Sequence, residues 1–561
     1  MKTKKNKKTR IDKKIDKIEI IPLGGLESIG KNMTLIKYKE EIIIIDCGIM
    51  FPTTEMPGID FIIPDFSYLL ENKKKIKALI ATHGHEDHIG AIPFLFEQIN
   101  VPLYATKFTL ALIKSKFEEK PPRGKPIYKE VHPRKKIKIG PFSIEFIRVN
   151  HSIPDGVALA IETDLGTIIH SGDFKIDFSP VDKEVTDLKR FADYGESGVL
   201  LFLSDSTNAE KEGFTKSEAI LEKKLFDIFS NAKSRIIVAT FSSNINRIQQ
   251  IFDTAQKFNR KVAISGMSMQ KNIRIAKSLS YLNFKDDLIV DINKIEAYPK
   301  KKLVILGTGT QGEPLSVLTR ISKGTHKHVS LEVKDSIVIT ASVIPGNEKM
   351  VINIVNSLMK MGADVFYAKE KDIHVSGHGA AKELKLMLSI IKPKFFMPVH
   401  GEFKHLKAHA EIAEKIQEKP SKTIIANNGD ILELTKDNFK KKDYVNLSQI
   451  YVEGQELGDI NNKVINERRT ILNEGIMFVT IVVSEGLLLR EPHLVTKGFI
   501  EDKKMKALPL ISKEVLSQAE KMLKDNLTSQ EIETHLKKRL SSFIYKNIQK
   551  RPLISVQILE V

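Results

Sequence analysis

Histidines and aspartates that follow predicted buried strands are the residues of this chain best suited to chemistry. The densest group lies in His83-Gly-His85-Glu-Asp87-His88, where three imidazoles and a carboxylate fall within six positions after an apolar run. In an extended loop, residues two apart point the same way, so His83 and His85 can hold one cation while Asp87 and His88 face a second. Clustered imidazoles beside a carboxylate predict a metal site rather than a polar turn.

Further candidate ligands end later strands of the chain. They are His151, Asp173 and His400, which bring the total to seven side chains. Seven ligands are enough for two divalent cations with one carboxylate between them. Imidazole suits zinc, whereas Mn²⁺ and Mg²⁺ prefer more oxygen ligands, so we expect two Zn²⁺, with Mn²⁺ or Mg²⁺ as the alternative for activity. Such a pair activates a shared water and stabilises an in-line displacement at phosphorus, so the predicted chemistry is hydrolysis.

The elements that must position these side chains alternate between strand and helix. The hydrophobic pattern predicts strands over 18–25, 34–38, 41–48, 77–82, 102–105 and 142–149, and helices over 89–100 and 107–117. Beyond Gly213 the alternation becomes regular, as in a parallel nucleotide-binding sheet, with polar turns at 241–244 and 307–312 whose backbone N–H groups suit phosphate. Residues 473–561 form a small α/β unit without a catalytic pattern. The predicted fold class is α/β.

Composition favours a polyanionic partner. The chain has 561 residues, enough for two or three domains, and a formal net charge of +18. Lysine and arginine facing phosphates gain binding free energy by counterion release, which favours nucleic acid, although a Lys-rich composition alone gives the same charge. The basic stretch 114–140 is interpreted either as a solvent-exposed charged surface or as a surface that binds an RNA backbone.

The sequence also predicts the compartment. The Lys-rich residues 1–17 have no apolar segment behind them, so we expect a disordered basic tail and neither a signal peptide nor a membrane anchor. No apolar run is long enough to span a bilayer. A single cysteine, Cys47, excludes an internal disulfide and a thiolate-built zinc site, which fits the reducing cytoplasm.

These motifs are similar to those of a known family. The first motif with His151, Asp173 and His400 resembles the metallo-β-lactamase superfamily. Three later blocks resemble the β-CASP nuclease branch of this superfamily. They are Ser204-Asp205-Ser-Thr-Asn208, His374-Val-Ser-Gly-His378-Gly and Pro398-Val-His400-Gly-Glu402. The chain is similar over nearly its whole length to bacterial ribonuclease J. The resemblance implies a metallo-β-lactamase αββα sandwich with an inserted β-CASP α/β domain and a small C-terminal α/β domain.

The resemblance also implies roles for individual residues. One metal would be held by His83, His85 and His151, the other by Asp87, His88 and His400, with Asp173 bridging. His378 would be the leaving-group acid or a transition-state stabiliser, and Asp205 would orient metal-bound histidines; with Asp87 they form the implied catalytic set. The residues that would bind nucleotide phosphates are Ser242, Ser243, Asn244, His374, Val375, Ser376, Gly377 and His378. A structural role for His374 stays open. His326 and His328 match no ligand and are expected at the surface, and His170 is expected in the core or beside the ligands.

Domain boundaries and partners follow from the same resemblance. The implied order is a basic tail 1–17, the first metallo-β-lactamase part 18–215, a β-CASP domain 216–374, the second part 375–450, a linker 451–472 and a C-terminal domain 473–561. The implied activity is endonuclease and 5′ to 3′ exonuclease cleavage of single-stranded, preferably 5′-monophosphorylated RNA, in RNA maturation and decay. A homodimer or homotetramer is implied, alone or with a paralogue or an RNA-degradation complex.

Three other functions remain open at this point. A β-CASP nuclease acting on DNA ends would differ in how it treats a ribose 2′-OH, which sequence does not reveal. A non-catalytic RNA-binding scaffold subunit predicts losses among the ligands, yet all seven are present. A small-molecule hydrolase of the superfamily would need neither the inserted domain nor the basic surface.

Overall fold

The computed structural model describes residues 16–53, 55–309, 316–341, 347–367, 373, 375–454, 456–457, 460–500 and 507–561. The chain forms two compact units. The first is Met1–Phe51 with Ile62–Ile450, and the second is Pro52–Phe61 with Tyr451–Val561. Of the predicted basic tail, residues 1–15 lie outside the described part. Among the described residues, no helix combines the length and apolar character needed to cross a bilayer.

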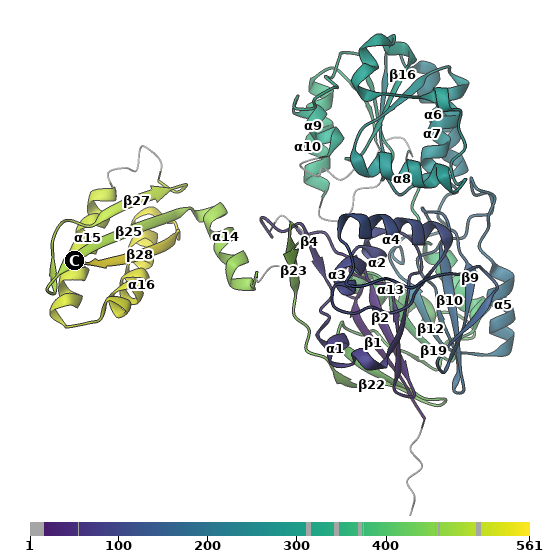
Figure 1. Cartoon of the computed structure of the whole chain (residues 1–561), viewed down its shortest axis with the longest axis horizontal. Helices are drawn as coiled ribbons and strands as arrows, with labels where there is room; N and C mark the ends of the chain where they lie inside the picture. Colours follow the sequence, from purple (N-terminus) through teal and green to yellow (C-terminus); the bar gives the residue numbers. More distant parts are fainter. Residues whose placement is uncertain are drawn as a thin grey trace, which may run out of the picture. The chain divides into compact units, whose positions relative to one another are not determined.

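Two facing sheets form the base of the first unit (Figure 1). The first sheet has eight strands, in the spatial order β22 (Phe439–Tyr444), β21 (Asp430–Leu434), β1 (Ile18–Gly24), β2 (Met33–Tyr38), β3 (Glu41–Ile45), β5 (Ile76–Ile80), β6 (Leu103–Ala105) and β7 (Tyr128–Glu130). The second has seven, β20 (Lys422–Thr423), β19 (Phe395–Val399), β12 (Val199–Asp205), β11 (Gly166–His170), β10 (Val157–Thr163), β9 (Phe142–Arg148) and β8 (Lys136–Ile139). Apolar side chains of both sheets, such as Ile36 and Ile80 from one and Phe146 and Leu203 from the other, make one buried cluster between them.

Helices cover the outer faces of this pair of sheets. They are α1 (Ser67–Glu71), α2 (Glu86–Ile89), α3 (Ile92–Phe96) and α4 (Lys107–Glu119) near the first sheet, and α5 (Leu188–Ser197), α12 (Ala381–Ile391) and α13 (Phe403–Glu414) on the second. Phe191 of α5 and Met387 of α12 pack against Phe202 of β12 in a second buried cluster. The base is therefore the predicted αββα sandwich. Strand β19 follows the inserted segment in the sequence and pairs with β12, which precedes it. The second sheet is therefore completed by the part of the chain that follows the insertion.

The inserted segment is a doubly wound domain. Its parallel sheet has the order β15 (Ile289–Val290), β14 (Lys261–Ile264), β16 (Leu303–Gly307), β13 (Ile236–Ala239), β17 (Ser336–Ile339) and β18 (Asp364–Phe366). Helices α6 (Ala219–Asn231) and α7 (Ile245–Lys257) lie on one side and α9 (Val317–Ser322) and α10 (Glu348–Lys360) on the other, while α8 (Met267–Ser278) lies at the end nearest α4 (Figure 1). The central strands β13 and β16 are short, apolar and buried along their whole length, as expected for a sheet covered on both faces.

The second unit contains a small sheet backed by two helices. Strand β25 (Ile476–Ser484) pairs with β26 (Leu487–Leu488), β27 (His493–Lys497) and β28 (Leu553–Glu560), and α15 (Ala507–Lys524) and α16 (Ser529–Ile548) pack on it. Short strands β23 (Ile450–Glu453) and β24 (Glu456–Leu457) and helix α14 (Asn462–Glu474) precede this sheet in the sequence. Much of the stretch expected to be a linker, 451–472, is thus regular structure. Asn461 caps α14 by accepting from the backbone N–H groups of Lys463 and Val464.

One predicted helix differs in the structure. The pattern predicted a single helix over 89–100, but in the structure α2 ends at Ile89 and a separate short helix, α3, covers only residues 92–96. The backbone N–H of Ala91 donates to the Cys47 carbonyl, and Pro93 has no N–H to donate, so the helical hydrogen-bond ladder is interrupted between them. Helix α2 is therefore a single turn, and it carries the predicted ligands Asp87 and His88.

Candidate metal centre

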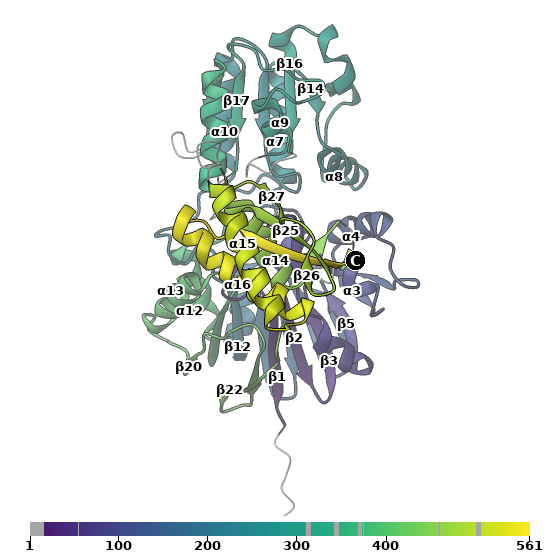
Figure 2. The ribbon, with the colours of Figure 1, turned by 90° about the vertical axis from the view of Figure 1, so that its left-hand side faces the viewer.

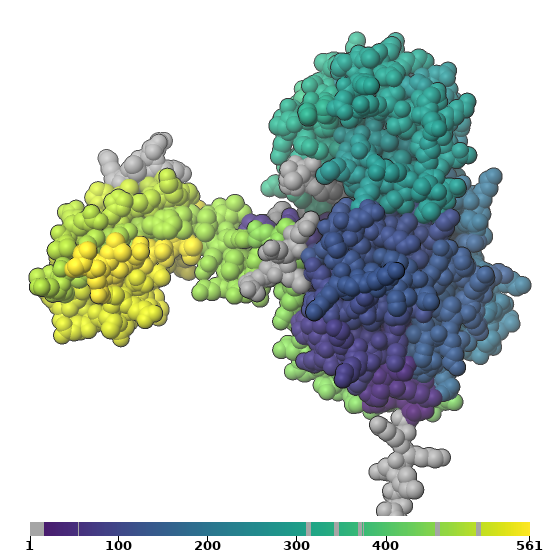
Figure 3. Space-filling view, viewed as in Figure 1, coloured from purple at the N-terminus to yellow at the C-terminus, as the bar shows by residue number. Residues whose placement is uncertain are grey.

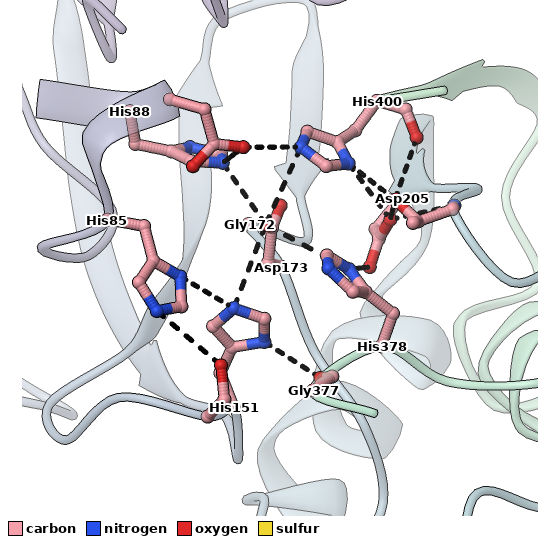
Figure 4. A network of polar contacts seen from close by, with 12 residues as sticks. His85, His88, His151, Gly172, Asp173, Asp205, Gly377, His378 and His400 are labelled. Atoms are coloured by element: carbon pink, nitrogen blue, oxygen red, sulfur yellow. Dashed lines mark hydrogen bonds and ion pairs between the residues drawn. The ribbon is translucent and has the colours of Figure 1, made fainter. Parts of the chain in front are cut away.

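Strand ends and the loops that follow them bring the seven predicted ligands together. His83, His85, Asp87 and His88 follow β5, and the other ligands follow β9, β11 and β19. Figure 4 shows the rings of His85, His88, His151 and His400 directed toward one centre, with the Asp173 carboxylate among them. Because His85 is extended and α2 begins directly after it, the chain turns between the two halves of the motif. The two halves therefore face two different ligand groups.

The first group consists of three imidazoles, of which those of His83 and His151 are buried and that of His85 is half-buried. Nδ1 of His85 lies 3.1 Å from Nε2 of His83 and 3.0 Å from Nε2 of His151. Burial lowers the pKa of His85 to about 4, and burial with the neighbouring imidazoles lowers the pKa values of His83 and His151 well below the ordinary value. Three neutral rings that converge on one point offer lone pairs to a soft or borderline cation, as zinc is.

The second group consists of Asp87, His88, Asp173 and His400, whose ligand atoms lie within 4.8 Å of one another. Oδ2 of Asp87 lies 3.2 Å from Nε2 of His400, and Oδ2 of Asp173 lies 3.1 Å from Nε2 of His88. The same Asp173 oxygen lies 3.7 Å from Nε2 of His83 and 3.9 Å from Nε2 of His151. One carboxylate oxygen therefore faces both groups, which is the position of a bridging ligand.

The second group contains two carboxylates, and without a metal ion their negative charge is balanced by protons on the neighbouring imidazoles. Burial alone would raise the pKa of Asp87 and Asp173, but the neighbouring imidazolium groups lower both. Conversely, burial would lower the pKa of His400 and His88, but Asp173 and the other carboxylates raise both, that of His400 to about 10. A divalent cation can replace these protons, because it supplies the positive charge that the two carboxylates attract.

Several of the rings have their second nitrogen held by a supporting residue. Nδ1 of His88 donates to Asp46 Oδ2 at 2.8 Å, and Nδ1 of His400 donates to Thr207 Oγ1 at 2.5 Å. Such contacts fix the tautomer and leave Nε2 to face a metal. Sequence reasoning missed Asp46 and Thr207 as site residues. Asp46 ends strand β3, so the strand-end signal that identified the other ligands was present there as well.

His378 lies at the edge of the second group, paired with a carboxylate. Its Nδ1 donates to Asp205 Oδ2 at 2.7 Å, and Asp205 Oδ1 accepts from the backbone N–H and hydroxyl of Thr207. Burial lowers the pKa of His378, but the nearby Asp205 charge has a larger effect in the opposite direction. The pKa of His378 is therefore above its ordinary value. Asp205 thus fixes the orientation of the ring, and Nε2 has no hydrogen-bond partner among the described residues. Asp205 and His378 also form, with Asp173 and His400, a third and overlapping cluster of ligand-type atoms.

The predicted phosphate-binding residues fall in two places. Ser242, Ser243 and Asn244 occupy the turn between β13 and α7 in the inserted domain, where Asn244 caps α7. The carbonyl and hydroxyl of Ser242 accept from Asn272 on α8. These contacts lie within the inserted domain and do not bring the turn into the ligand cluster.

The second predicted block, 374–378, borders the metal centre. His374 lies outside the described residues, and Val375 is buried and apolar. Ser376 Oγ accepts from Asn208 at 2.8 Å and from the backbone N–H of His378. The carbonyl of Gly377 accepts from Nδ1 of His151 at 2.7 Å (Figure 4). In the structure, these backbone and hydroxyl groups thus support residues of the centre itself.

The remaining predicted histidines lie apart from the ligand groups. His170 is buried and its Nδ1 accepts from the backbone N–H of Gly172, so it supports the turn that carries Asp173. His326 and His328, expected at the surface, are half-buried. Nε2 of His326 lies 2.9 Å from Oγ of Ser265, within hydrogen-bond distance. In the basic stretch 114–140, four cations form ion pairs with acidic residues; they are Lys116, Lys120, Arg134 and Lys136. These pairs reduce the charge that this stretch offers to a polyanion.

Family models match the chain in four segments. Residues 29–204 match the metallo-beta-lactamase superfamily, and residues 367–425 match the Zn-dependent metallo-hydrolase RNA specificity domain. Residues 233–358 match the ribonuclease J beta-CASP domain, and residues 463–561 match the ribonuclease J C-terminal domain. A crystal structure of a protein of unknown function from Enterococcus faecalis V583 aligns with a TM-score of 0.53 at 16% identity, covering 74% of this chain and all of that one, which supports the fold alone.

Curated relatives match almost end to end. Ribonuclease J2 of Bacillus subtilis is 37% identical over 98% of this chain and 100% of its own length. Ribonuclease J of Helicobacter pylori strain 26695 is 41% identical over 96% of this chain and 79% of its own, and that of Thermus thermophilus is 41% identical over 87% and 85%. The buried histidine and aspartate centre, the inserted domain and these matches agree, and the chain belongs to the ribonuclease J family.

Proposed function

We propose that this chain is a metal-dependent ribonuclease that hydrolyses phosphodiester bonds of RNA. The single observation that carries the proposal is the position of Asp173 Oδ2, which faces both ligand groups at 3.1 to 3.9 Å. The family matches favour RNA over DNA ends as the substrate, and they favour an enzyme over a scaffold subunit.

The ligand groups fit two Zn²⁺ per chain. His83, His85 and His151 would hold one ion, and Asp87, His88 and His400 would hold the other, with Asp173 between them. Mn²⁺ or Mg²⁺ is the alternative for activity, and the oxygen-containing second group is the better place for either. When bound, the ion pair would supply an activated water and neutralise charge that develops on the phosphate.

The protein's own groups would complete the reaction. A ribose oxygen that leaves phosphorus must gain a proton. His378 is suited to give it, because Asp205 accepts from Nδ1 and raises the pKa of the ring, while Nε2 has no hydrogen-bond partner among the described residues. Asp205 also contacts Thr207, which holds His400, so one carboxylate would orient both the acid and a ligand.

Substrate binding would extend from this centre into the inserted domain. We assign phosphate binding to Ser242, Ser243 and Asn244, whose turn precedes helix α7, and to the block 374–378 beside the metal centre. The expected substrate is single-stranded RNA, preferably with a 5′ monophosphate, cleaved internally and from the 5′ end.

The remaining assignments are also proposals. The domain boundaries are 18–215 and 375–450 for the metallo-β-lactamase part, 216–374 for the β-CASP domain and 473–561 for the C-terminal domain. We further propose a homodimer or homotetramer that works alone or with a paralogue or RNA-degradation complex. A cytoplasmic location is supported by the single buried Cys47, since a reducing compartment needs no disulfides.

The proposal is tested with a 3′-labelled, 5′-monophosphorylated single-stranded RNA and the matching DNA. We expect cleavage of the RNA alone, lost in His85→Ala and retained in His132→Ala, whose imidazole is exposed and apart from the centre. Cleavage of the DNA alone would instead favour the DNA-end nuclease, and cleavage of neither would favour the scaffold.

A further inference from the structure

The loop that carries the ligand His151 is fixed at its far end by Asp155. This aspartate has a left-handed backbone, with φ of 64°, which a non-glycine residue adopts at a cost that surrounding contacts must offset. Asp155 Oδ2 accepts from the backbone N–H of Phe108 at 3.2 Å, in the first turn of α4, and its carbonyl accepts from Thr106 Oγ1 at 3.0 Å. The carboxylate thus caps α4 from a distant part of the sequence.

The inserted domain contacts the same carboxylate oxygen. The hydroxyl of Tyr281 donates to Asp155 Oδ2, and the ring of Tyr281 packs on buried Phe108 with centroids 5.0 Å apart. Burial and the Asp155 charge both raise the pKa of Tyr281, so the hydroxyl keeps its proton and remains a donor. A half-buried hydrogen bond to a charged acceptor is among the stronger hydrogen bonds of a protein.

Tyr281 is itself firmly attached to the inserted domain. It follows α8, and its backbone N–H donates to the Ala276 carbonyl at 2.8 Å. Two residues later, the backbone N–H of Asn283 donates to Gln249 of α7 at 2.8 Å. The tyrosine therefore moves with α7 and α8 and not as a loose side chain of a loop.

Helices α4 and α8 form the surroundings of this contact. Lys271 of α8 donates to the Ser115 carbonyl at 2.7 Å and to Glu119 at 2.6 Å, both on α4. The two helices lie side by side in both ribbon views, and the space-filling view shows the inserted domain in contact with the α4 region (Figures 1, 2 and 3). Tyr281 extends this contact to the loop of a metal ligand.

We propose that Tyr281 is a positioning residue for the metal centre: through Asp155 it holds the His151 loop, and so couples docking of the inserted domain to a complete three-histidine ligand group. This inference rests on the proposed two-metal function. Metal ligands tolerate displacements of only about 0.2 Å, so small shifts of this loop matter for affinity. The coupling is reciprocal, since a metal that binds the docked arrangement more tightly also favours docking.

The test compares zinc binding in Tyr281→Phe and in the full-length parent after removal of metal with a chelator. We expect the dissociation constant of the His83–His85–His151 group for Zn²⁺ to rise about tenfold, as for loss of a hydrogen bond that supports a metal ligand. Tyr128→Phe is the matched control, because in the described part of the chain its hydroxyl has no hydrogen-bond partner while its ring packs on Phe117. Unchanged zinc affinity in Tyr281→Phe, or an equal loss in the control, overturns the inference.

A double-variant cycle shows whether Tyr281 acts through Asp155. In an Asp155→Ala background, Tyr281→Phe should change zinc affinity less than twofold, and RNA cleavage lost in Tyr281→Phe should return with excess Zn²⁺. A full tenfold effect without Asp155, or a loss that excess zinc does not restore, contradicts a positioning role. If the parent cleaves no RNA, the proposed function fails, whereas the zinc titrations still decide this inference.

Discussion

Nδ1 of His151 donates to the carbonyl of Gly377 at 2.7 Å, across 226 residues of sequence. The contact joins a ligand on the first part of the sandwich to the segment that re-enters it after the inserted domain. It leaves Nε2 of His151 to face the three-histidine group, where it lies 3.0 Å from His85. The metal centre is therefore completed only when the chain has returned from the insertion.

Gly377→Ala should weaken metal binding through this contact. A Cβ at position 377 would lie 2.6 Å from Cε1 of His151, so the ring or the segment must move. We expect a roughly 10- to 100-fold loss of zinc affinity, measured by titration of the metal-free chain. Gly156→Ala is the control, because its Cβ would meet nothing closer than 3.4 Å. Equal affinities of the two variants would contradict the account.

His378→Gln should lower the rate of the chemical step. Loss of a general acid costs roughly 10²- to 10⁴-fold, which single-turnover cleavage at saturating enzyme would measure. An RNA with sulfur in place of the leaving oxygen needs little protonation, so with it the deficit of the variant should shrink. A deficit that stays the same with this substrate would assign His378 to another role.

Asp87→Ala and His85→Ala should abolish cleavage and leave most RNA binding intact. Each removes a ligand atom of the centre, whereas phosphate contacts are spread over the basic surface of a chain with a net charge of +18. Fluorescence anisotropy with labelled RNA would measure binding beside the cleavage assay. Loss of binding in proportion to loss of cleavage would argue against separate binding and catalytic surfaces.

His409 should make the folded state sensitive to acid. The side chain is buried on α13, where burial lowers its pKa to about 3, while the unfolded chain has the ordinary value near 6.5. Between these values only the unfolded chain takes up the proton, so the free energy of unfolding falls as pH falls, by up to about 1.4 kcal/mol per pH unit. His409→Asn removes this titration.

The expected result is that the difference in unfolding free energy between parent and His409→Asn narrows from pH 6.5 to pH 4. Denaturant melts of both proteins with a chelator present would exclude effects of metal loss. A difference that is constant over this range would mean that His409 is not held neutral.

The sequence identified the metal ligands but not their supports. His83, His151 and His400 were predictable because each ends an apolar strand, and strand ends of a layered α/β fold meet at one edge. Thr207 and Gly377 contribute through hydrogen bonds between segments that only the fold brings together. Tyr281 carries no chemical signal of its own in the sequence.

The hydrophobic pattern of the sequence did not predict every feature of the fold. The apolar run after His88 was predicted as a single helix, but its hydrogen-bond ladder is broken by the tertiary contact of Ala91 with Cys47. The order of the two sheets was not predictable from hydrophobic periodicity, since β19 and β12 are neighbours in space and lie nearly two hundred residues apart. The resemblance to a known family supplied that arrangement.

The most direct test of the two-metal account is a zinc titration of the chelator-stripped chain with RNA cleavage measured at every point. The ligand groups predict that two equivalents of Zn²⁺ bind per chain and that cleavage rises with the second equivalent. Full cleavage with one equivalent bound, or a chain that binds only one ion, would contradict the account.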